Sequence, residues 1–138
     1  MDNNNIFIEK LRSSGLRSTK QRIEICKLLF NRKKTFHFTI SDLSKILKKE
    51  TSNKISLATL YNTIISFKKK GYLKEISINS DKSYFDTNTS NHHHFINENT
   101  NEIVDLHASH VSNIKIKKNL PGKKIKSIEV LVKLENNN

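Results

Sequence analysis

The chain has 138 residues, 35% of them hydrophobic, which allows one domain or two small ones with modest cores. A single cysteine excludes an intrachain disulfide and a zinc site built from several thiolates. No apolar run reaches the roughly 18 residues of a membrane span, and the first residues lack the pattern of a secretion signal, so we expect a cytoplasmic protein.

The net charge of +12 suggests an anionic partner such as nucleic acid, and its distribution indicates where that partner binds. Residues 1–86 carry 18 Lys and Arg against 8 Asp and Glu, a net of +10, whereas residues 87–138 carry 7 against 5, a net of +2. We therefore expect DNA to bind the first part of the chain.

Three helices are predicted in the first 50 residues. The first ends near Gly15, which suits a left-handed C-terminal cap. The second is capped by Ser18 or Thr19 and buries Cys26, which we interpret as a small buried hydrophobe rather than as a reactive thiol or a ligand. The third begins with a capping box over residues 39–42 and buries the stripe Leu43, Ile46 and Leu47.

A fourth helix and a hairpin complete a predicted winged helix-turn-helix over residues 1–86. The helix starts near Ser56 and ends at Gly71, and strands at 72–78 and 82–85 flank a turn. The predicted buried stripe of the helix contains Leu57, Leu60, Ile64 and Phe67. Residues off that stripe are candidates to contact bases or phosphates in DNA: Thr59, Tyr61, Asn62 and Thr63.

The histidine triplet at 92–94 is the strongest sign of a ligand site. In an extended chain His92 and His94 point to one face and His93 to the other, so two imidazoles can converge on one ion. Asp86 and Asp105 are oxygen donors on either side of the triplet. A polar turn or a tag-like artefact is the alternative, and the apolar strand residues that follow favour a ligand site.

The remainder, residues 87–138, is predicted to be a small α/β domain. Strands are expected at 95–96 and 103–104 and near 128–134, with a helical stretch at 107–118. His107 and His110 would lie on that helix, and we interpret them as surface residues. Exposed strand edges in so small a unit favour pairing with a second copy, a homodimer. The fold class is therefore α+β.

Several motifs resemble the Fur (ferric uptake regulator) superfamily over roughly residues 9–134. They are the segment "LRSSGLRSTKQR" from Leu11, "ISLATLYNT" from Ile55, "YFD" ending at Asp86 and "HHHF" from His92. Asn62 after Tyr61, "FDTN" before the triplet and "NEIVDL" after it look most like the haem-responsive Irr (iron response regulator) branch.

The resemblance implies a homodimer in which two winged helices read an inverted repeat in AT-rich operator DNA. Tyr61 would contact bases, and Arg17 would enter the minor groove. A sensory site for Fe, Mn or Zn would use His37, Asp86, His92, His94 and Asp105. The Irr branch implies haem as a regulatory ligand at His92, His93 and His94.

The chain also departs from the family pattern. Many Fur proteins hold a structural zinc in paired Cys-x-x-Cys motifs, but Asn97 and Thr100 occupy the first pair here and no second pair exists. We therefore expect no structural zinc held by four cysteines. The Cys-Pro haem motif of some Irr proteins is absent as well, which leaves histidines as the expected haem ligands.

Three classes of function are compatible with these features. The first is a DNA-binding regulator of iron or haem homeostasis genes controlled by haem, a divalent metal or both, with a Fur-like Fe(II)-, Mn(II)- or Zn(II)-activated repressor as the alternative. The second is a winged-helix DNA-binding protein with a vestigial ligand site. The third is a metal-dependent hydrolase, which is disfavoured because nothing near the triplet supplies an evident general acid or a Gly-rich substrate loop.

Overall fold

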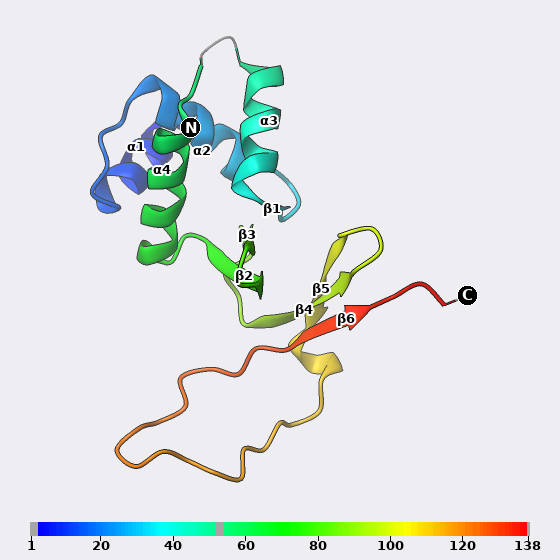
Figure 1. Cartoon of the computed structure of the whole chain (residues 1–138). Coiled ribbons are helices and arrows are strands. Elements are labelled where there is room, and N and C mark those ends of the chain that lie inside the picture. Colours follow the sequence, from blue (N-terminus) through cyan, green and yellow to red (C-terminus); the bar gives the residue numbers. More distant parts are fainter. Residues whose placement is uncertain (1–2, 52–53, 138) are drawn as a thin grey trace. The chain divides into compact units, whose positions relative to one another are not determined.

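The computed structural model describes residues 3–51 and 54–137, which fall into two compact units, Met1–Thr89 and Ser90–Asn138 (Figure 1). The first unit contains four α-helices and a small sheet, and the second contains another small sheet. The predicted α+β class is confirmed. Among the described residues, no helix has the length and apolar character needed to cross a membrane.

The caps predicted for the helices of the first unit lie at the ends of the observed helices. Helix α1 covers Asn3–Ser13, and Gly15 follows it with a left-handed φ of 77°. Helix α2 covers Lys20–Phe30, and the Thr19 side chain accepts a hydrogen bond from the backbone N–H of Arg22. Of the two capping residues considered for α2, Thr19 is therefore the one used.

Helices α3 and α4 carry the clearest end signals. Helix α3, Ile40–Glu50, starts with the predicted capping box, in which the side chains of Thr39 and Asp42 each accept the other's backbone N–H. Helix α4, Leu57–Lys70, is capped by Ser56 and ends at Gly71, whose φ of 91° is a left-handed conformation that glycine adopts without strain.

The sheet of the first unit has the order β1-β3-β2, with both pairs antiparallel. Strands β2, Lys74–Asn79, and β3, Lys82–Asp86, form the predicted hairpin, and the Asp81 N–H donates to Asn79 Oδ1 at 2.9 Å in the turn. The two-residue strand β1, His37–Phe38, pairs with the end of β3 and was not predicted.

The core of the first unit lies between the helices and this sheet. Two residues of α4 differ from the predicted stripe. Leu57 is 61% exposed because it lies at the first helical position, beyond the packed turns, and Thr63 is fully buried. The Thr63 hydroxyl donates to the Thr59 carbonyl at 2.7 Å, which satisfies the polar group inside the core. The buried hydrophobic residues of this core are Phe7, Leu11, Ile25, Cys26, Leu29, Phe38, Leu43, Leu47, Leu60, Ile64, Phe67, Leu73 and Phe85.

The second unit is a three-stranded sheet of order β5-β4-β6. Strands β4, His92–Asn97, and β5, Ile103–His107, are antiparallel, and β6, Leu131–Leu134, runs parallel to β4. The predicted helix at 107–118 is wrong, since only the short 3-10 helix η1, Ala108–His110, forms there. Beyond it, isoleucine and lysine alternate with a period of two, which gives a helix no apolar face.

Candidate metal centre and recognition helix

In the first unit, one imidazole and one carboxylate lie close together. His37 and Asp86 are direct partners in the pairing of β1 with β3, and His37 Nε2 lies 3.1 Å from Asp86 Oδ2. Asp86 is fully buried, and its other oxygen accepts the Asn88 N–H at 2.8 Å. The register of two strands therefore holds these two ligand atoms together from positions far apart in the sequence.

The second unit brings together two imidazoles and a carboxylate. His92 and His94 lie on one face of β4, as predicted, and their ring centroids are 4.4 Å apart. The register of β4 with β5 places Asp105 opposite His94, so that Asp105 Oδ1 lies 3.1 Å from His92 Nε2 and 3.4 Å from His94 Nε2. The ligand atoms of these three residues, which we call the triad, lie within 4.8 Å of one another.

Backbone contacts orient two of the three histidines in β4. The Nδ1–H of His92 donates to the Ser90 carbonyl at 2.7 Å, which orients the ring so that Nε2 faces Asp105. His93 accepts the Val130 N–H through Nδ1 at 3.0 Å. Residue types could not have revealed Ser90 and Val130 as partners, because both act through the backbone.

The available donors fit a borderline divalent ion. Imidazole nitrogen together with carboxylate oxygen suits Fe(II), Mn(II) or Zn(II). Cys26 supplies no thiolate, because burial in the first unit raises the pKa of its thiol to about 12. The prediction that Cys26 is a buried hydrophobe is confirmed. His107 and His110 are exposed, as expected, although His107 ends β5 and only His110 lies on the short helix η1.

Helix α4 presents polar side chains outward from the core of the first unit. Tyr61 is 57% exposed, and Asn62 is exposed beside it. Thr59 is half-buried, and its hydroxyl accepts from Ser56 Oγ at 2.9 Å. Arg17, in the loop after α1, is also exposed. Thr63 is buried and so cannot contact DNA, whereas the other four candidates remain accessible.

Asn97, which stands at a position of the family's first Cys-x-x-Cys pair, belongs to an asparagine cluster with Asn99 and Asn136. Asn97 Oδ1 accepts the N–H groups of Asn99 at 2.9 Å and Thr100 at 3.3 Å, and Asn97 Nδ2 donates to Asn136 Oδ1 at 3.3 Å. The Asn136 N–H donates to Asn99 Oδ1 at 2.7 Å. The cluster ties the turn between β4 and β5 to the chain after β6.

Comparison with known proteins gives consistent matches. A sequence model of the Ferric uptake regulator family matches residues 13–133. The chain is 36% identical over 119 residues to the Peroxide operon regulator of Bacillus subtilis, covering 79% of this chain and 80% of that protein. It is 39% identical over 100 residues to the Peroxide-responsive repressor PerR of Staphylococcus epidermidis, covering 72% of this chain and 65% of that protein.

The fold also has a solved counterpart. The Ferric uptake regulator from Pseudomonas aeruginosa, solved with manganese, matches with a TM-score of 0.69 at 16% identity and covers 96% of this chain and 99% of that one. At this identity the match shows the fold alone. The two sequence relatives are named as peroxide regulators, so they give no support to the predicted Irr branch.

Proposed function

Because the chain belongs to the Ferric uptake regulator family, we propose that it is a metal-dependent DNA-binding repressor that peroxide releases from its operator. Members of the family are metal-responsive transcriptional regulators rather than enzymes, which removes the hydrolase hypothesis. The observation that carries the proposal is the triad, which places two imidazoles and a carboxylate on one face of a strand pair.

In this proposal, one divalent ion binds His37 and Asp86 together with the triad. Both sets consist of nitrogen and carboxylate donors, and each is held by the register of two strands. An ion that takes ligands from both units favours the one arrangement of those units that satisfies all five ligands. If that arrangement is the one that binds DNA, metal binding strengthens DNA binding by the same factor by which DNA strengthens metal binding.

The DNA contact is assigned to helix α4 of a homodimer reading an AT-rich inverted repeat. The exposed Tyr61 and Asn62 would meet base edges, while Thr59 and Arg17 support the contact at the backbone and the minor groove. Replacing Tyr61 with alanine should weaken binding to a selected operator by about 1–3 kcal/mol and spare binding to a random duplex. Equal losses on the two duplexes would contradict this assignment.

The names of the relatives suggest peroxide as the signal, and the donors allow a redox-active metal. Fe(II) is oxidised by peroxide, whereas Zn(II) has no redox chemistry and can serve as a control ion in the same ligands. We expect the metal-free protein to bind a selected operator weakly and the Fe(II)- and Zn(II)-loaded forms to bind it tightly. Peroxide should then release the Fe(II) form only.

The experiment is an anaerobic gel shift on operator duplexes selected in vitro, with His92→Ala/His94→Ala as the test variant. His107→Ala/His110→Ala is the matched control, because it removes two exposed imidazoles from the same unit. The test variant should lose the response to metal, and the control should keep it. Tight binding by the metal-free protein, or release of the Zn(II) form by peroxide, would argue against the proposal.

Haem at His92, His93 and His94 stays a prediction without support from the relatives. His93 Nδ1 already accepts a backbone hydrogen bond, and all three side chains are buried, so haem would have to displace existing contacts. Titration of haem, followed through the Soret band and operator binding together, tests it. Release by one equivalent of haem without peroxide would replace peroxide with haem as the signal.

A further inference from the structure

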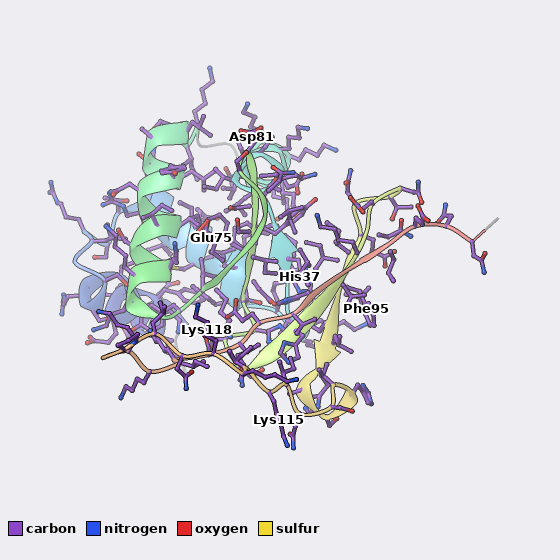
Figure 2. The ribbon with its side chains drawn as sticks, turned by 60° about the horizontal axis from the view of Figure 1, so that its bottom comes forward. His37, Glu75, Asp81, Phe95, Lys115 and Lys118 are labelled. Atoms are coloured by element: carbon purple, nitrogen blue, oxygen red, sulfur yellow. The ribbon has the colours of Figure 1, made fainter. Side chains whose placement is uncertain are left out.

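A lysine-rich stretch of the second unit, residues 114–126, contributes to no core and forms no regular structure. Between η1 and β6 the chain forms neither helix nor strand and runs as a long open loop (Figure 1). Every residue from Ser112 to Ser127 is exposed. We call residues 114–126 the lysine segment, and Figure 2 labels two of its side chains, Lys115 and Lys118.

The charge of the lysine segment is not neutralised within its unit. It holds six lysines and no acidic residue in 13 positions, and no Asp or Glu occurs between Asp105 and Glu129. Among the residues described by the structure, none of the six ammonium groups takes part in an ion pair. Like charges so closely spaced repel one another, which favours an open segment and a polyanionic partner.

We propose that the lysine segment is a second DNA contact, which binds the phosphate backbone of duplex DNA without regard to base sequence. Ammonium groups bind phosphates as point charges and carry no base readout of their own. The proposal rests on the proposed function only in taking duplex DNA as the partner. It adds a contact outside helix α4, in the unit that carries the triad.

The composition of the segment favours duplex DNA over other polyanions. The segment contains no aromatic residue, so it cannot stack on the bases of a single strand. Binding at a membrane surface is commonly the work of an amphipathic helix with Trp or Phe on its apolar face, and the segment has neither the helix nor those residues. Lysines spaced along an extended chain instead suit the repeating phosphates of a duplex.

The length of the loop gives the lysines a wide reach. Its ends are fixed by η1 at one side and β6 at the other, and residues 111–130 connect them. Ten extended residues on each side span about 30 Å, so the middle of the loop can move far from its sheet without unfolding it. A contact of this kind needs no fixed geometry, because it depends on charge alone.

The test measures how binding to a random-sequence 30-base-pair duplex depends on salt, with chelator present so that the metal response plays no part. The test variant replaces all six lysines, Lys115, Lys117, Lys118, Lys123, Lys124 and Lys126, with glutamine, and the matched control replaces the same six with arginine. Each lost phosphate contact reduces the slope of log K against log salt by about 0.9. We expect the slope to fall by one to about five units with glutamine and to persist with arginine.

A second measurement on the unaltered chain guards against misfolding of the variant. Acetylation of lysines, mapped by mass spectrometry, should be slower in the lysine segment when the duplex is present. An unchanged salt slope, or equal acetylation with and without duplex, overturns the proposal. So does loss of binding to vesicles containing phosphatidylserine with no change on the duplex. Failure of the metal response at the triad would leave these results intact, so the two proposals fail separately.

Discussion

Replacing Asp105 with asparagine removes one charge from the triad while nearly preserving the size of the side chain. Asp105 Oδ1 lies 3.1 Å from His92 Nε2 and 3.4 Å from His94 Nε2, so it faces both imidazoles. A charged hydrogen-bonding group contributes about 1.5–3 kcal/mol, and the 29% exposure of this side chain places it toward the lower end. At about 1.4 kcal/mol per factor of ten, the lower end means that metal affinity should fall roughly tenfold.

The assay is competition for Zn(II) against a chromogenic chelator, with the unfolding midpoint of the metal-free protein measured alongside. Glu102→Gln is the matched control, because it removes an exposed carboxylate just before the same strand. We expect its metal affinity to equal that of the unaltered chain. Unchanged affinity in Asp105→Asn, or an equal loss in Glu102→Gln, would refute the assignment of Asp105 as a ligand.

Three further predictions concern stability and ion content. The Cys26 thiol, with a pKa raised from 9.0 to about 12 by burial, should resist iodoacetamide at pH 8 until the chain unfolds, as mass spectrometry can follow. Because folding raises the pKa of the Cys26 thiol, the thiol's contribution to the free energy of unfolding is complete below about pH 9. That contribution should decline between pH 9 and 12, which urea unfolding at several pH values would detect. Ser56→Ala should lower the urea unfolding free energy by about 1 kcal/mol, since the Thr59 N–H loses its cap; no change would contradict that role. Asn97→Ala should lower the unfolding free energy by about 1 kcal/mol, because it removes the hydrogen bonds of the Asn97 side chain. Elemental analysis should find one metal ion per chain in both the unaltered protein and this variant. Two ions per chain would point to a second metal site.

Local signals predicted most of the first unit. The capping box at Thr39 and the left-handed Gly71 are set by nearby residues, and the structure reproduces both. Local patterns did not predict which residues of α4 are buried, because tertiary packing determines this. Leu57 is exposed at the first helical position, and Thr63 is buried because a carbonyl one turn earlier satisfies its hydroxyl. Strand β1 has two residues and depends on pairing with β3, which no local pattern reveals.

In the candidate metal centre, too, local patterns predicted part of the arrangement and strand pairing determined the rest. The alternation of a strand predicted that His92 and His94 share a face, and they do. Asp86 was indicated by its place beside the triplet, but its pairing with His37 was not, because strand pairing joins the two across 48 intervening residues. Only the family resemblance indicated His37 before the structure. The helix predicted at 107–118 failed because the isoleucines there alternate with lysines instead of recurring every three or four residues.

The asparagine cluster has a consequence for how selectively an oxidant would act on this protein. Thiolates are common targets of peroxide, and a zinc site made of cysteines would offer several of them. Here the turn and the chain after β6 are joined by amides, and the single thiol of the chain is buried and protonated. If an oxidant is the signal, its effect on DNA binding cannot come from oxidation of zinc-binding cysteines at this turn, because amides join the turn to the chain after β6. The asparagine cluster offers an oxidant no thiolate, so it would hold the turn and the chain after β6 together while the candidate metal centre reacts.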